Sequence, residues 1–121
     1  MAKILIADDA LFMRMTLGDI LKSANYEVCE AKNGAEMLVV YEREQPDLVM
    51  LDITMPEMDG LTALRELKKK YPKAKVIMCS AMGQQVMVMD AIRSGAYDFI
   101  VKPFERSKVM DSIKKVLAMK L

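Results

Sequence analysis

Short apolar runs alternate along the chain with longer segments in which apolar residues recur every three or four positions. The runs predict five strands, and their nearly continuous apolar character is typical of strands buried on both faces. Their ranges are Ile4–Ala7, Glu27–Ala31, Leu48–Leu51, Lys75–Cys79 and Asp98–Val101. The segments with helical spacing predict amphipathic helices, for example at Met13, Leu17, Ile20, Leu21 and Ala24 and at Val109, Ile113, Val116 and Leu117.

Strands that alternate with helices predict an α/β fold. Consecutive parallel strands need a crossover connection, and a helix is the usual one, so five such units give a parallel sheet with helices on both faces. At 121 residues the chain fits a single domain, residues 1–121. In sheets of this kind ligands bind beyond the carboxyl ends of the strands.

The charge and hydropathy of the chain exclude several classes of protein. Its net charge is only +1, which argues against a basic surface for nucleic acid or a membrane. No apolar segment approaches membrane-spanning length and the N-terminus has no secretory pattern, so we expect a cytoplasmic protein. The chain has no histidine, which excludes histidine-based catalysis, the usual zinc sites and a phosphohistidine on this chain.

The two cysteines, Cys29 and Cys79, both fall inside predicted strands. Small buried hydrophobes are the favoured interpretation, and a disulfide is not expected in a reducing compartment.

Polar residues follow four of the predicted strands directly. They are Asp8 and Asp9 after the first strand, Asp52 after the third, Ser80 after the fourth, and Lys102 with Pro103 after the fifth. Because the carboxyl ends of parallel strands meet at one edge of the sheet, we expect these side chains to lie together.

This set of side chains suits a divalent cation and a phosphoryl group. Carboxylates are the hard oxygen ligands that Mg²⁺ prefers, and three acids against one lysine predict that at least one carboxyl pKa is raised. With the cation present, Lys102 and Ser80 can contact phosphoryl oxygens. One carboxylate is then free to act as the nucleophile and form an acyl phosphate.

Four segments, "ILIADDALFMR", "DLVMLDITMPEMDGL", "VIMCSAMG" and "AYDFIVKPF", resemble the receiver domain of two-component response regulators. The resemblance spans the chain and is strongest to single-domain chemotaxis regulators of the CheY type. It implies a flavodoxin-like, three-layer fold with strand order 2-1-3-4-5. In that order Cys29 and Cys79 lie three strands apart, beyond the reach of a disulfide.

The resemblance also implies a role for each site residue. The phosphoacceptor is Asp52, and Asp8 and Asp9 hold the Mg²⁺. Thr54 supplies a backbone carbonyl to the metal, so its side chain is free to vary. By the same resemblance, Lys102 contacts the phosphoryl group, and the peptide bond between Lys102 and Pro103 is cis. Ser80 is the switch hydroxyl and Phe99 is the switch aromatic.

Two of these residues depart from a common pattern of the family, in which the switch hydroxyl is often threonine and the switch aromatic tyrosine. Ser80 lacks the methyl group of threonine, which loosens the expected coupling. Phe99 has no hydroxyl, so its movement would be a packing event alone.

Phosphorylation of Asp52 is expected to draw Ser80 toward the phosphoryl group and let Phe99 move inward. This would change the face formed by the fourth helix, the fifth strand and the fifth helix, which we expect to bind an output protein. The implied partners are a histidine kinase, the flagellar motor switch and a phosphatase, with the chain itself a monomer. No output domain is expected after the last helix.

Other functions stay open at the level of sequence. Within the same class, the chain could be a phosphorelay intermediate or a receiver excised from a larger regulator. An aspartyl-phosphate phosphatase of the haloacid dehalogenase type needs a second acid two residues after the nucleophile, where this chain has Thr54. A flavin carrier of the flavodoxin type is disfavoured because Asp8 and Asp9 would repel a phosphate without a metal. A scaffold without phosphorylation is disfavoured because the set of site residues is complete.

The segment "SAMGQQVMVMD" is rich in methionine, with Met82, Met87 and Met89 beside the expected output face. These residues could form an adaptable docking surface or fill gaps in the core, and the sequence favours neither.

Overall fold

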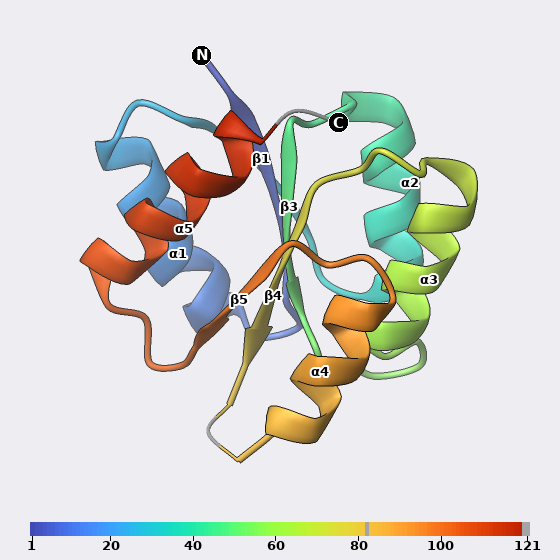
Figure 1. Ribbon diagram of the computed structural model, residues 1–121. Helices are drawn as coiled ribbons and strands as arrows, with labels where there is room; N and C mark the ends of the chain where they lie inside the picture. Colours follow the sequence, from blue (N-terminus) through green and yellow to red (C-terminus); the bar gives the residue numbers. More distant parts are fainter. Residues whose placement is uncertain (82, 120–121) are drawn as a thin grey trace.

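Five parallel strands form the central sheet in residues 1–81 and 83–119, which the computed structural model describes (Figure 1). They are β1 (Lys3–Ala7), β2 (Glu27–Ala31), β3 (Leu48–Asp52), β4 (Val76–Ser80) and β5 (Asp98–Val101). The order across the sheet is β2-β1-β3-β4-β5, with every neighbouring pair parallel. The predicted α/β fold and strand order are confirmed.

Four strand boundaries differ by one residue from those predicted. β1 begins at Lys3, and β3 and β4 each extend to include a polar residue, Asp52 and Ser80, while β4 begins at Val76 rather than Lys75. Asp52 is in register with Cys79, and Ser80 with Val101. A strand continues as long as its backbone pairs, whatever the polarity of its side chains, and the apolar pattern therefore misplaced these ends.

Helices cover both faces of the sheet. They are α1 (Leu11–Ser23), α2 (Gly34–Glu44), α3 (Gly60–Lys70), α4 (Gln85–Arg93) and α5 (Arg106–Ala118). Figure 1 shows α1 and α5 on one face and α2, α3 and α4 on the other. Asn33 and Asp59 begin α2 and α3 as N-caps, since each side chain accepts a hydrogen bond from a backbone N–H in the first turn.

Each face of the sheet has its own apolar core. Alternate residues of β1 point into different cores. Ile4 and Ile6 pack with α1 and α5, whereas Leu5 and Ala7 pack with α2, α3 and α4. Cys29 and Cys79 are free thiols, and burial raises the pKa of Cys79 well above its ordinary value. In the part of the chain that the structure describes, no helix is long and apolar enough to cross a membrane.

The methionines of α4 divide between core and surface. Met87 is partly buried and packs against the core under α2, α3 and α4, whereas Met89 is 56 % exposed. Met82 lies outside the described residues. The core interpretation therefore holds for Met87, while Met89 is exposed and its docking role stays a prediction.

The start of α3 lies directly against the end of β3. The backbone N–H of Gly60 donates to the carbonyl of Ile53 at 2.7 Å. A Cβ atom at Gly60 would overlap the carbonyl oxygen of Asp52 and lie 2.7 Å from Cα of Ile53. Only glycine allows this close approach, which fixes the strand end that carries Asp52.

Gly60→Ala is expected to lower the free energy of unfolding by about 2 kcal/mol, because α3 must move away from β3. Chemical denaturation measures this change. Gly18→Ala is the matched control: Gly18 is also a buried glycine in a helix, but its Cβ would meet only Cδ1 of Ile6 at 4.0 Å. That variant should be neutral or gain up to about 1 kcal/mol from helix propensity. Equal losses in the two variants would contradict the close-approach argument.

Candidate functional site

Three carboxylates meet at the carboxyl edge of the sheet, the lower edge in Figure 1. Asp8 and Asp9 follow β1, and Asp52 ends the neighbouring strand β3. One oxygen from each carboxylate lies within 4.8 Å of the others. Asp8 and Asp52 are buried, at 3 % and 5 % exposed, whereas Asp9 is exposed to solvent. The sequence predicted that these three acids would lie together, and the structure brings them together.

Lys102 places one positive charge among these acids. Its Nζ lies 2.9 Å from Oδ2 of Asp8 and 3.2 Å from Oδ1 of Asp52. The residue follows β5, and its backbone N–H donates to the carbonyl of Ser80 at 2.7 Å, which ties the end of β5 to the end of β4. The peptide bond between Lys102 and Pro103 is cis, the geometry that the resemblance implies.

Backbone and side-chain hydrogen bonds hold Asp8 in place. Its Oδ1 accepts from the backbone N–H of Ala10 at 2.9 Å, and its backbone N–H donates to the carbonyl of Ala31. Nη1 of Arg14 donates to the Asp8 carbonyl at 2.8 Å, while Nε of Arg14 bonds to Glu30. The sequence analysis did not single out Arg14. The sequence pattern only weakly indicates a role for Arg14, because arginine is common in the first turns of exposed helices.

The electrostatics of the site make Asp52 harder to ionise than an ordinary aspartate. Burial, together with the charge of Asp8, raises the pKa of Asp52 to about 6, although Lys102 and a backbone hydrogen bond at Thr54 act in the opposite direction. Burial lowers the pKa of Lys102, but the two carboxylates raise it more, so its net shift is upward and it stays charged. The prediction that one carboxyl pKa is raised is confirmed, and the group concerned is Asp52.

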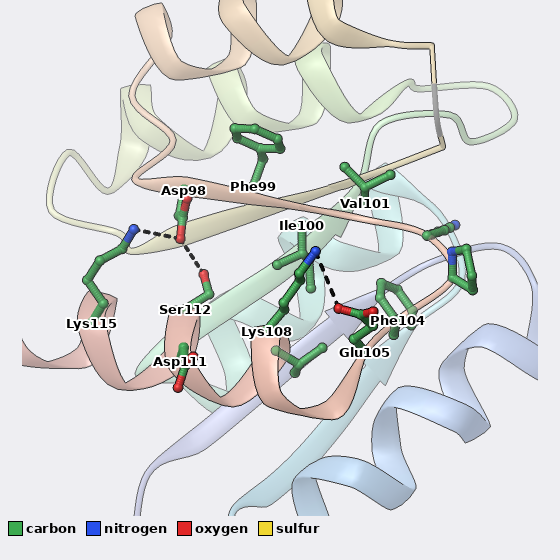
Figure 2. Close-up of a pocket in the computed structure, with 13 residues that line it drawn as sticks. Asp98, Phe99, Ile100, Val101, Phe104, Glu105, Lys108, Asp111, Ser112 and Lys115 are labelled. Carbon is green, nitrogen blue, oxygen red and sulfur yellow. Dashed lines mark hydrogen bonds and ion pairs between the residues drawn. The ribbon is translucent and has the colours of Figure 1, made fainter.

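Ser80 and Phe99 lie on the same face of the sheet. In register, Ser80 pairs with Val101 and Met78 pairs with Phe99, so these four side chains point toward the layer of α2, α3 and α4. Figure 2 shows Phe99 and Val101 on one side of β5 and Ile100 on the other. Ser80 is 1 % exposed and Phe99 is 42 % exposed. The expected switch residues are therefore neighbours, one buried and one at the surface.

Thr54 has a side-chain partner that the sequence analysis did not foresee. Its hydroxyl oxygen accepts a hydrogen bond from Nε2 of Gln84 at 2.9 Å. Oε1 of the same glutamine accepts from the backbone N–H of Ala81 at 2.8 Å. Gln84 thus connects the loop after β3 to the loop after β4.

The donor set fits a hard divalent cation. Three carboxylates against one ammonium leave the cluster with excess negative charge, and a dication would offset it. Carboxylate and carbonyl oxygens suit Mg²⁺, which keeps part of its water shell when it binds to proteins. Asp9 is exposed, so a partly hydrated ion has access to the site.

Comparison with known proteins identifies the class to which this fold and site belong. The family model described as "Response regulator receiver domain" matches residues 4–114. The chemotaxis protein CheY of Bacillus subtilis is 58 % identical over 95 % of this chain and 97 % of that protein. The CheY of a CheX–CheY–BeF₃–Mg²⁺ complex from Borrelia burgdorferi superposes with a TM-score of 0.92 at 37 % identity, over 98 % of this chain and 90 % of that one. NtrX from Brucella abortus also has a TM-score of 0.92 at 36 % identity, but the 96 % of this chain that matches spans only 26 % of NtrX.

The chain belongs to the response regulator receiver family, which has the flavodoxin-like fold. More closely, it is a CheY-like receiver domain of a two-component response regulator, and its CheY relatives support a role in the regulation of chemotaxis. This is a signalling family and not a family of catalytic enzymes. The haloacid dehalogenase and flavin-carrier alternatives are thereby left without support.

The raised pKa of Asp52 predicts that the carboxylate destabilises the metal-free protein at neutral pH. Between about pH 4 and pH 6 the folded protein keeps a proton on Asp52 that the unfolded chain has already lost. The free energy of unfolding therefore falls as the pH rises through this window. Asp52→Asn removes this cost and is expected to stabilise the protein at pH 7 by up to about 3 kcal/mol.

Chemical denaturation in EDTA at pH 4, 5, 6 and 7 tests this prediction. The advantage of Asp52→Asn should shrink toward zero as the pH falls to about 4. Asp59→Asn, at an exposed helix N-cap, is the matched control and should give no gain in stability at pH 7. An advantage that is the same at every pH would show that ionisation of Asp52 is not its cause.

Proposed function

We propose that Asp52 accepts a phosphoryl group from a histidine kinase, with Mg²⁺ bound at Asp8 and Asp9. The observation that supports this proposal is the cluster itself: three carboxylates within 4.8 Å of one another, and Lys102 between Asp8 and Asp52. The modified protein then binds an output protein through the face formed by α4, β5 and α5. In chemotaxis that output is the flagellar motor switch.

The residues that would hold Mg²⁺ are Asp8, Asp9 and Asp52, together with the backbone carbonyl of Thr54. When bound, the ion would offset the negative charge that develops on the phosphoryl oxygens. The Mg²⁺ and BeF₃ in the Borrelia burgdorferi complex support this assignment. Asp8 is already oriented by Ala10 and Arg14, so the ligand set needs little rearrangement.

In the transfer step, a carboxylate oxygen of Asp52 attacks the phosphorus of a phosphohistidine. The new O–P bond forms as the N–P bond breaks, and the imidazole nitrogen keeps the electron pair and takes up a proton. Because residues 1–121 contain no histidine, the donor histidine lies outside them. Lys102, now within reach of both Asp8 and Asp52, contacts a phosphoryl oxygen. The only reactions of the chain itself are phosphorylation from small donors and hydrolysis of its own acyl phosphate.

The switch starts from Ser80 and ends at Phe99. A phosphoryl group adds about two negative charges and three acceptor oxygens, and the Ser80 hydroxyl moves to donate to one of them. Phe99 then moves into the space next to Ser80 on the same face of the sheet. The 42 % exposure of Phe99 supports its assignment as the aromatic side chain that moves inward.

The proposed output face combines apolar side chains with a groove. Large apolar residues are exposed along α4 and β5: Val86, Met89, Ile92, Phe99 and Val101. A groove of about 630 Å³ lies between β5 and α5, with Ile100, Phe104 and Val109 among its lining residues (Figure 2). An exposed apolar face of this kind is typical of a surface that binds a protein.

The remaining parts of the proposal concern the state of the protein in the cell. Residues 1–121 form one receiver domain that is a cytoplasmic monomer and binds neither nucleic acid nor membrane. A phosphatase is a second partner. A CheX-like protein is a further candidate for a binding partner, because the Borrelia burgdorferi CheY was solved in a complex with CheX. A role as a phosphorelay intermediate is less well supported, since the CheY of Bacillus subtilis is 58 % identical to this chain.

Incubation with Mg²⁺ and acetyl phosphate is expected to add the mass of one phosphoryl group. Intact-protein mass spectrometry measures the product. The adduct should be absent in Asp52→Asn and in the wild-type protein with EDTA, whereas Asp47→Asn, at an exposed acid in the loop before β3, should behave as the wild type. An adduct that persists in Asp52→Asn would move the phosphoacceptor to another residue.

Ser80→Ala is expected to leave phosphorylation of Asp52 intact and to weaken binding of the output protein about 5-fold or more. The reason is that the variant retains the nucleophile but loses the hydroxyl that moves toward the phosphoryl group. Binding of the phosphorylated protein to purified motor-switch protein gives the affinity. Ser23→Ala, at the far end of α1, is the control. Unchanged affinity in Ser80→Ala would rule out the proposed switch.

A further inference from the structure

Gln84 occupies the N-cap position of α4, but its side chain does not cap the helix. Short polar side chains are preferred at this position because they accept hydrogen bonds from the first turn. Here the longer glutamine side chain reaches back instead, accepting from the backbone N–H of Ala81 at 2.8 Å and donating to the Thr54 hydroxyl at 2.9 Å. A residue that breaks a local rule while making specific distant contacts is a candidate for a functional role.

The two loops that Gln84 connects are those next to the phosphoacceptor. Thr54 lies two residues after Asp52, and Ala81 directly follows Ser80. β3 and β4 are neighbours in the sheet, with Asp52 in register with Cys79. The side chain of Gln84 therefore bridges the metal-binding loop and the loop that carries the switch hydroxyl.

This bridge opposes the proposed movement of Ser80. Ser80 and Ala81 share a peptide bond, so a movement of the Ser80 backbone toward a phosphoryl group displaces the N–H of Ala81. That displacement must either break the hydrogen bond to Gln84 or carry the start of α4 along with it. In both cases, contacts that stabilise the resting arrangement must be broken or moved before the switched arrangement can form.

We propose that Gln84 is a latch that holds the loop after β4 in its resting position and whose release is part of the switch. This inference depends on the proposed phosphorylation of Asp52. Gln84 acts as a positioning residue, through Ala81 and Thr54, and makes no contact with the phosphoryl group. Loss of both hydrogen bonds of the bridge shifts the two-state equilibrium by about 3- to 10-fold. Without the latch, the switched arrangement is more populated before phosphorylation.

Gln84→Ser removes the latch but keeps a residue that can cap the start of α4. Serine is a good N-cap and keeps the helix start intact, but it is too short to reach Thr54. If the switched arrangement is the reactive one, the rate of phosphorylation by acetyl phosphate with Mg²⁺ should rise about 3- to 10-fold. Thr54→Val removes one of the two hydrogen bonds and should give a smaller increase. The double variant should be no faster than Gln84→Ser alone, because both changes act on the same bridge.

Two further measurements distinguish the latch from a purely structural role. Hydrogen exchange at the Ala81 amide, followed by NMR, should be faster in Gln84→Ser, while the midpoint of chemical denaturation should be unchanged or higher. Rates of phosphorylation equal to or below the wild-type rate in Gln84→Ser would overturn the latch even if Asp52 is modified normally. A wild-type protein that takes up no phosphoryl group would overturn the proposed function and the latch with it.

Discussion

Repulsion among three carboxylates at one edge of a parallel sheet is the constraint on which the rest of this structure depends. Asp8 and Asp52 are both buried, and in that environment two negative charges are costly unless they have a compensating cation. Lys102 offsets part of the charge, but burial and the charge of Asp8 still raise the pKa of Asp52 to about 6. The same deficit of positive charge makes the site a good one for a dication. Binding of a dication at the three carboxylates is therefore expected to stabilise the resting protein.

That local charge is connected to the surface by the geometry of the sheet. Ser80 is on the strand next to Asp52, and its register partner Val101 is on the edge strand beside Phe99. A change at the acidic edge thus needs to cross only one further strand to reach exposed apolar side chains. The backbone hydrogen bond from Lys102 to Ser80 links the cation and the hydroxyl more directly. Such short connections allow a few contacts to control a whole face.

The sequence was sufficient for the fold and for the principal site residues, and the reasons are physical. Asp8, Asp52 and Lys102 each follow or end an apolar strand, so parallel topology alone brings them together. The strand ends were misplaced by one residue because pairing, and not polarity, ends a strand. Arg14 and Gln84 could not be assigned from the sequence, since long side chains on exposed helix starts have many conformations. Their partners are seen only in the folded structure.

The position of Lys102 after the final strand has a consequence for protein synthesis. A nascent chain that has left the ribosome as far as α4 already carries every acid of the cluster, but not the lysine that holds Asp8 and Asp52 together. Its acidic edge remains repulsive until β5 pairs with β4.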